Sequence, residues 1–234
     1  MPPSTAPATP IKIDIWSDIA CPWCYIGKRK FELGRTEFEA TGTAPAVEIE
    51  YHSFELHPDT PVDYVGTERQ WLMDRKGLSA AQVDPAFERA AGLAAAVGLT
   101  YNHGDLAHFN TIKAHQFVHF AKARGVQGAA MDRTLRAYFV EGRRVSDVES
   151  LADLGVELGF DRAEVARSLT TDEYLDDVLA DKRQAAELGI QGVPFFVIDG
   201  KYGLSGAQDS ATFTEALQRV ATERAEVSAA GEGS

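Results

Sequence analysis

The chain has 234 residues, 44% of them hydrophobic, and carries 35 acidic against 23 basic side chains, a formal net charge of −12 at pH 7. This apolar content is enough for a well-buried core, either as one large domain or as a domain with an insertion. The negative charge argues against nucleic acid or an anionic membrane as the main partner, because both favour a basic protein surface. No uninterrupted apolar run approaches the roughly 20 residues of a transmembrane helix.

The first ten residues are dominated by Pro, Ala, Ser and Thr, and lack both the basic residues and the apolar core of a signal peptide. We therefore expect residues 1–10 to form a disordered leader and the protein to be cytoplasmic. Structural disulfides are rare in that compartment, so a lone pair of cysteines indicates redox or metal chemistry.

A Cys-x-x-Cys motif follows the first predicted strand. Residues 11–16 alternate apolar and polar side chains, which predicts a strand, and Cys21 and Cys24 come where this strand gives way to a helix. The free N–H groups and the positive end of a helix dipole stabilise an anion, and the thiolate is the reacting form of cysteine. We predict that Cys21 is the exposed nucleophile and Cys24 the buried resolving thiol.

The residues between the cysteines suit a redox role. Pro22 fits the first turn of a helix, because its missing N–H would have no intrahelical partner there. Pro22 and Trp23 are expected to tune the redox potential and contact the substrate, although Trp23 as a support for the loop is an alternative. Structural zinc is a weaker interpretation, since one cysteine pair would have to recruit distant histidines, and we predict no metal site. Two unreactive core cysteines are the third interpretation.

The cysteines open a β-α-β unit. A helix is predicted over residues 22–40 and ends in the Gly- and Pro-containing stretch 41–45. Residues 47–54 alternate again and predict a second strand, which should be parallel to the first with a right-handed crossover. Residues 57–61 are a predicted loop.

A helical block follows, with no convincing strand from about residue 64 to residue 189. Asp84-Pro85 is a point at which its second helix could split or restart, and residues 100–104 are a predicted loop. Asn110 or Thr111 can cap the third helix. The predicted helices cover about residues 67–76, 79–97, 112–125, 129–140, 147–158, 162–169 and 172–188.

The chain then returns to strands. Residues 195–198 are a short apolar run typical of a buried strand, Asp199-Gly200 is a strong hairpin signal, and residues 201–205 should pair with the run. A last amphipathic helix follows. We therefore predict an α/β protein with a thioredoxin-like fold (β-α-β … β-β-α) and a large all-helical insertion. Its parts are a disordered leader (1–10), the first half of the thioredoxin-like domain (11–62), the inserted helical domain (63–189), the second half (190–227) and a disordered tail (228–234).

Several segments together resemble the DsbA-like thioredoxin-fold family, and more closely its FrnE-like branch of cytoplasmic dithiol–disulfide oxidoreductases. The resemblance covers roughly residues 11–220, and the combination of motifs is specific, although Cys-x-x-Cys alone would not be. The segments are Ser17-Asp18, Cys21-Pro22-Trp23-Cys24, Phe54-Glu55-Leu56-His57-Pro58, Asn110-Thr111-Ile112-Lys113-Ala114-His115, Gly192-Val193-Pro194-Phe195-Phe196 and Ser205-Gly206-Ala207-Gln208.

The resemblance implies that the Val193–Pro194 peptide bond is cis and lies against the disulfide. The backbone of Val193 would then be free to pair with an extended thiol substrate. From the residues alone, Pro194 could equally be the first residue of a strand, which proline tolerates.

A related branch shares the inserted fold: the 2-hydroxychromene-2-carboxylate isomerases and kappa-class glutathione transferases. These enzymes use glutathione and typically have serine where this chain has Cys21. A dithiol at Cys21 and Cys24 can be oxidised and reduced without glutathione, so the isomerase or transferase interpretation comes second. No cofactor is predicted, with glutathione as an optional co-substrate.

Other polar residues have weaker functional interpretations. Asp14 and Asp18 flank the end of the first strand, and a buried acid there could accept the proton of Cys24. His115 and His119 imitate a helical zinc motif but lack its glutamate and a third ligand. Asn110 and His115 could line a cleft beside the cysteines, or serve as a helix cap and a core histidine.

The sequence thus predicts a cytoplasmic thiol–disulfide oxidoreductase of the DsbA-like type. Cys21 attacks a disulfide, Cys24 resolves the mixed disulfide, and the substrate is a protein or a small molecule bearing a thiol or disulfide. Nucleic acid and membrane are not expected partners, and a homodimer is one option for the oligomeric state. A non-enzymatic binding module or chaperone is a further alternative, which would tolerate Cys21→Ser. The physiological substrate, in polyketide tailoring or in stress defence, and the direction of the redox reaction do not follow from the sequence.

Overall fold

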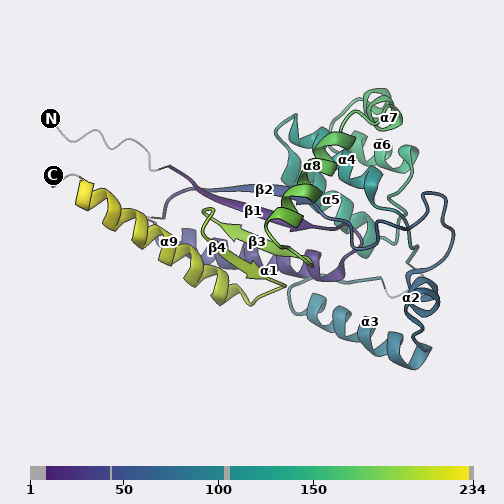
Figure 1. Cartoon of the computed structure of the whole chain (residues 1–234), viewed down its shortest axis with the longest axis horizontal. Helices are drawn as coiled ribbons and strands as arrows, with labels where there is room; N and C mark the ends of the chain where they lie inside the picture. The colour runs from purple at the N-terminus through teal and green to yellow at the C-terminus, as the bar shows by residue number, and fades with distance from the viewer. Residues whose placement is uncertain (1–8, 43, 103–105, 232–234) are drawn as a thin grey trace.

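A four-stranded mixed sheet forms the centre of the protein (Figure 1). In this computed structural model, β1 pairs in parallel with β2 and antiparallel with β3, and β4 is antiparallel to β3. The strand order is β2-β1-β3-β4, which confirms the predicted thioredoxin-like α/β fold with a large helical part. The strands are β1 (Ile11–Ser17), β2 (Val47–Ser53), β3 (Phe195–Ile198) and β4 (Tyr202–Ser205).

The structure describes residues 9–42, 44–102 and 106–231. Most of the predicted leader, the last residues of the predicted tail, and His103 and Gly104 of the predicted loop lie outside the described residues. Within the described part, none of the helices has an apolar stretch long enough to span a bilayer.

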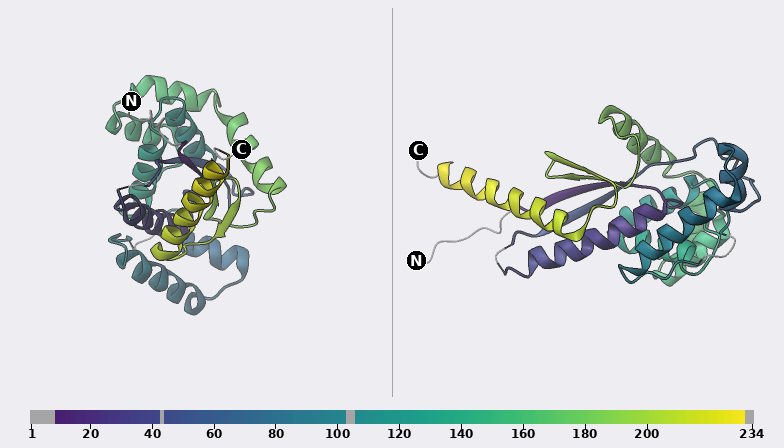
Figure 2. Two further views of the ribbon diagram at one scale, coloured as in Figure 1. Left: turned by 90° about the vertical axis from the view of Figure 1, so that its left-hand side faces the viewer. Right: turned by 90° about the horizontal axis from the view of Figure 1, so that it is seen from below.

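Two helices, α1 (Pro22–Glu39) and α9 (Ser210–Gly231), pack against each other on one face of the sheet (Figure 2). Three aromatic side chains join these layers: Phe31 of α1, Phe196 of β3 and Phe213 of α9, with ring centroids 4.7 to 5.7 Å apart. All three are fully buried, so they contribute both apolar burial and favourable edge contacts to the core. This packing places the start of α1, where the two cysteines lie, beside the C-terminal end of β1.

The hairpin between β3 and β4 turns at Asp199 and Gly200, whose φ angles are 56° and 65°. Both residues therefore have the left-handed backbone conformation that the two-residue turn of an Asp-Gly hairpin requires. The last helix differs from the prediction: α9 continues to Gly231 and includes residues 228–231, which the sequence assigned to the disordered tail. Alanines 229 and 230 are strong helix formers, which explains the continuation.

A block of helices lies between β2 and β3 along the chain and beside the sheet in space (Figure 1). Helices α5 and α8 contact β2, and α3 contacts α1. Pro85 lies inside α3 and does not split it, because the alanine-rich remainder of the segment favours the helix. The helices are α2 (Glu68–Lys76), α3 (Ala80–Ala95), α4 (Ile112–Lys122), α5 (Gln127–Phe139), α6 (Val148–Glu157), α7 (Arg162–Thr170) and α8 (Leu175–Glu187).

A buried ionic network fastens α8 to the sheet. The Asp181 carboxylate accepts hydrogen bonds from His52 Nδ1 (2.9 Å), His119 Nε2 (2.9 Å) and the Ser53 backbone N–H (2.7 Å). His52 Nε2 donates in turn to Asp14 at 2.8 Å. Burial by itself would raise the pKa of Asp181, but these donors outweigh it and hold the pKa well below its usual range. Helix α8 leads directly to the Val193–Pro194 loop, so the network positions that loop as well.

The same network predicts that the free energy of unfolding falls as the pH rises above neutrality. Burial lowers the pKa of His52, but its hydrogen bonds to Asp14 and Asp181 outweigh this and raise it from 6.5 to about 9. The folded state therefore holds this proton more tightly than the unfolded chain. The resulting stabilisation is complete below about pH 6.5 and is lost as the pH rises to about 9, on the order of 3 kcal/mol in all.

Urea unfolding at a series of pH values measures this slope. In His52→Gln the free energy of unfolding should be lower at pH 6.5 and nearly flat up to pH 8, before the thiols titrate. A variant with the same slope as the original protein would contradict the assignment to His52.

Candidate active site

The two cysteines lie at the beginning of α1. Cys21 is the N-cap residue, with φ −88° and ψ 113°, and Pro22 occupies the first turn as predicted. The backbone N–H of Cys24 donates to the carbonyl of Cys21 at 3.0 Å, and both cysteines are free thiols. Cys24 is buried as expected, but the prediction of an exposed Cys21 is wrong, since only 2% of that residue is exposed. Its environment explains the difference, because the Val193–Pro194 loop packs over its thiol.

The Val193–Pro194 peptide bond is cis, and the carbonyl oxygen of Val193 accepts a hydrogen bond from the Cys21 thiol at 3.5 Å. The carbonyl of Pro194 accepts from the Gly206 N–H at 2.8 Å, which fastens the loop to the end of β4. Helix α1 approaches the loop through Gly27, where a Cβ would lie 2.9 Å from Cγ of Pro194. A glycine is therefore needed at this position for the two segments to come so close.

Cys24 lies in an environment that keeps its thiol protonated. Burial raises the pKa of Cys24 well above its ordinary value, and the neighbouring Cys21 thiol raises it further. The backbone N–H of Asp18 at 3.4 Å and the Ser17 side chain act in the opposite direction, because they stabilise the thiolate. Cys24 is thus a protonated thiol, and it can attack only after a base, or a thiolate that leaves during disulfide exchange, accepts its proton.

Neither acid predicted near the cysteines is a good proton acceptor in this geometry. The buried carboxylate of Asp18 accepts from the Leu56 N–H at 2.8 Å and lies 3.3 Å from His115 Nε2. Burial raises the pKa of Asp18, but His115 outweighs it, and the pKa is lower than usual. Asp14 faces His52 and Lys12 instead. Asp18 therefore acts as a fixed anion that holds the segment after β2 against the start of α1.

Asn110 and His115 have the structural roles that were their alternative interpretation. Asn110, which precedes the N-cap residue Thr111, accepts from the Ile112 N–H at 2.9 Å and donates to the Thr60 carbonyl at 2.8 Å, so it binds the first N–H of α4 and joins the helix to a loop. His115 is 1% exposed and bonds to Asp18, while His119 bonds to Asp181. The two histidines thus bind separate carboxylates and do not converge on one point.

One group of three potential metal ligands occurs within the described ranges: Asp14, Glu50 and His52. The ammonium of Lys12 already lies 3.0 Å from Asp14 and 2.8 Å from Glu50, so a lysine provides the positive charge there. Neither cysteine belongs to such a group. Among the described residues, the cysteine pair therefore has no third side chain of this kind close enough to share a metal ion with it.

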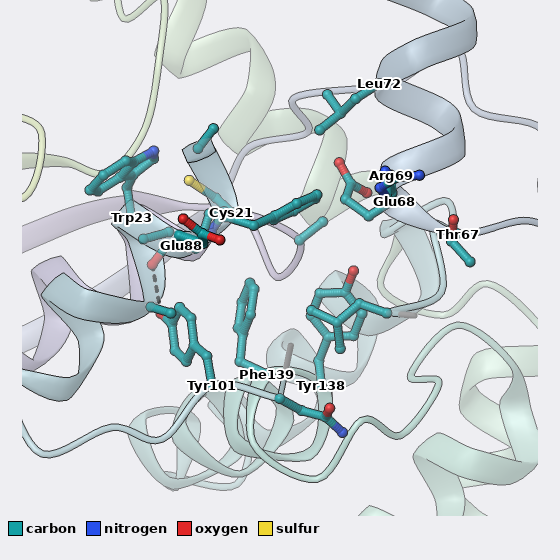
Figure 3. A pocket seen from close by; sticks show the side chains of 18 of the residues that line it. Cys21, Trp23, Thr67, Glu68, Arg69, Leu72, Glu88, Tyr101, Tyr138 and Phe139 are labelled. Atoms are coloured by element: carbon teal, nitrogen blue, oxygen red, sulfur yellow. Dashed lines mark hydrogen bonds between the residues drawn. The ribbon is translucent and has the colours of Figure 1, made fainter. Parts of the chain in front are cut away.

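A pocket of about 740 Å³ opens beside Cys21, between the start of α1 and the helical block (Figure 3). Pro22 and Trp23 form part of its wall together with Cys21. The Tyr101 hydroxyl donates to the Pro22 carbonyl at 2.7 Å, and this bond ties the helical block to the cysteine motif. Most of the wall is apolar, and its aromatic members are Trp23, Phe87, Tyr101, Tyr138 and Phe139.

One interpretation of the sequence was a cleft beside the cysteines lined by Asn110 and His115, but neither residue lines this pocket. Its wall combines α2, α3, α5 and the segment after β2, and no local pattern shows that these stretches share a cavity. The capping box of Thr67 and Gln70 at the start of α2 is visible in the sequence, and it orients Glu68 and Arg69. It indicates a helix start, however, and not a binding site.

Comparisons with known proteins agree with this geometry. The family model described as DSBA-like thioredoxin domain matches residues 12–218. A solved structure described as a probable DsbA oxidoreductase from Streptomyces coelicolor is 42% identical, covers 89% of both chains and has a TM-score of 0.82. An uncharacterised protein of Bacillus subtilis, YwbO, is 28% identical over 88% of this chain and 96% of its own length. The cytosolic disulfide reductase DsbM of Pseudomonas aeruginosa, solved with GSH, shares the fold at 19% identity, with a TM-score of 0.62 and coverage of 92% and 99%.

Proposed function

The chain belongs to the DSBA-like thioredoxin domain family, and from this premise we propose that Cys21 and Cys24 are the redox-active dithiol of a FrnE-like thiol–disulfide oxidoreductase. That the protein is a redox enzyme follows from the family and its oxidoreductase relatives. One observation supports the dithiol most directly: both free thiols lie at the start of α1, and that of Cys21 faces the carbonyl before Pro194.

In the proposed reaction the Cys21 thiolate attacks one sulfur of a substrate disulfide. The substrate S–S bond breaks, one thiolate leaves and takes a proton, and a mixed disulfide remains on Cys21. Cys24 then loses its proton and attacks Cys21, which releases the second thiol and forms the Cys21–Cys24 disulfide. The protein gives up two electrons and two protons, and the substrate accepts them. The reverse sequence oxidises a dithiol substrate.

The high pKa of Cys24 suits this order of events. A protonated Cys24 leaves Cys21 as the attacking thiol, and the thiolate departing from the mixed disulfide can accept the proton of Cys24. Val193, Pro194, Pro22 and Trp23 are the proposed substrate contacts, since the Val193 carbonyl faces the Cys21 thiol and Pro22 and Trp23 line the pocket beside it. The Val193 carbonyl can accept a hydrogen bond from the backbone of an extended substrate once the substrate displaces the thiol hydrogen.

We propose the cytoplasm as the site of action, because the chain has a single cysteine pair and the fold is shared with a cytosolic reductase. The dithiol needs no bound cofactor. Glutathione is a candidate redox partner, because the structure of that reductase contains it.

A redox titration in a buffered thiol–disulfide couple tests the proposal. We expect one reversible two-electron transition, followed through the Cys21–Cys24 thiols by mass shift after alkylation, and its absence in Cys24→Ser. The midpoint gives the direction in which the protein works. If no intramolecular disulfide forms at any potential and glutathione is trapped on Cys21, the isomerase or transferase alternative replaces this proposal.

A further inference from the structure

The pocket beside Cys21 has the size of a small-molecule site. Its volume of about 740 Å³ lies in the range typical of pockets that bind compact organic ligands. Cys21 is one of the wall residues, so the pocket lies directly beside the proposed nucleophile (Figure 3). The aromatic wall favours carbon-rich groups over charged ones at its centre.

The charges in the wall are mostly negative. Its acids are Glu68, Asp84 and Glu88, against a single basic side chain, Arg69. The Arg69 guanidinium binds both carboxylate oxygens of Asp84, at 2.8 and 3.0 Å, so this pair is neutral as a unit. Glu68 bonds to His108 at 2.6 Å and is half-buried, whereas Glu88 is exposed and has no ionic partner within the described part of the chain.

Within the described ranges, the basic side chains near the pocket do not offset this negative charge. Burial lowers the pKa of His57, another wall residue, so its ring is neutral at pH 7. The lysines that follow the cysteines are already paired: Lys28 with Glu32 and Asp132, and Lys30 with Asp209. The thiolate of Cys21 would therefore meet its substrate in a pocket with excess negative charge.

We infer that this pocket binds the organic part of a low-molecular-weight thiol or disulfide, with a preference for neutral or cationic arms, and that Glu88 slows the reaction of anionic ones, glutathione among them. The inference rests on the proposed function, because it requires exchange at Cys21. The disulfide R–S–S–R enters with one arm in the pocket, Cys21 attacks the nearer sulfur, and Cys24 completes the reaction. Two molecules of R–SH leave with the two electrons and two protons that the dithiol supplies.

Three small disulfides that differ mainly in charge test the inference: cystamine (cationic), hydroxyethyl disulfide (neutral) and dithiodiglycolate (anionic). Oxidation of the reduced protein is followed by stopped flow, and each rate is divided by that of dithiothreitol with the same disulfide, which removes intrinsic reactivity. We expect cystamine to be favoured over dithiodiglycolate by about tenfold at low ionic strength, with a smaller preference at high salt.

Glu88→Gln should reduce this preference by about threefold to fivefold. Glu226→Gln is the matched control, because it removes the same charge from an exposed position on α9, and it should leave the preference unchanged. Equal normalised rates for all three disulfides, or an equal effect of the two variants on the preference, would overturn the pocket inference. Exchange with hydroxyethyl disulfide in the same experiment would still support the proposed function. Failure to react with any of the three would overturn the proposed function itself.

Discussion

Cys21→Ser is expected to abolish disulfide exchange, with the rate falling to that of the uncatalysed control. A serine hydroxyl cannot form a disulfide, and Cys24 cannot substitute, because its thiol is buried and its pKa is well above the ordinary value. The measurement is reduction of hydroxyethyl disulfide by the protein with dithiothreitol as the electron source. The fold should persist, since the serine is close in volume to the thiol it replaces, and circular dichroism checks this.

Cys24→Ser is the matched variant and should behave differently. It keeps the attacking thiol, so it should form a mixed disulfide with one half of the substrate, visible as a mass increase that dithiothreitol reverses. Multiple turnovers should stop or become dependent on an added thiol. A Cys24→Ser protein with full activity would instead indicate the glutathione-dependent isomerase or transferase, which needs only Cys21. A Cys21→Ser protein with full biological function would indicate the non-enzymatic binding module.

Asp181→Ala is expected to lower the free energy of unfolding by about 3–5 kcal/mol. The substitution removes the acceptor of His52, His119 and the Ser53 N–H at once, and leaves these donors buried without that partner. Urea unfolding should show a lower midpoint with a similar slope. Because α8 leads into the Val193–Pro194 loop, the variant should also exchange disulfides more slowly.

Asp177→Ala on the same helix is the control. Asp177 is exposed in the first turn of α8, where its interaction with the helix dipole contributes less than about 1 kcal/mol. Equal losses of stability in the two variants would show that the buried network contributes no more than an ordinary surface carboxylate, and would contradict the role assigned to Asp181.

Local patterns in the sequence determined the order of the elements and the position of the cysteine pair. The alternation of residues 11–16, the Asp199-Gly200 turn and the Cys-x-x-Cys spacing each depend on neighbours along the chain, so the strand, the hairpin and the start of α1 could be predicted. The boundaries were less certain. Pro85 did not divide α3, and α9 ran through residues 228–231, because favourable alanines next to these positions outweighed the signal to stop.

The tertiary structure alone decided how the site is enclosed and charged. Cys21 is buried because a loop distant in the sequence packs over it, and the pocket exists because α2, α3 and α5 converge beside it. Asp181 looks like any acid on an amphipathic helix until folding places it against His52. Burial, pKa and pocket charge all depend on which side chains come into contact in the folded chain. The periodicity of a single segment carries no information about these tertiary contacts.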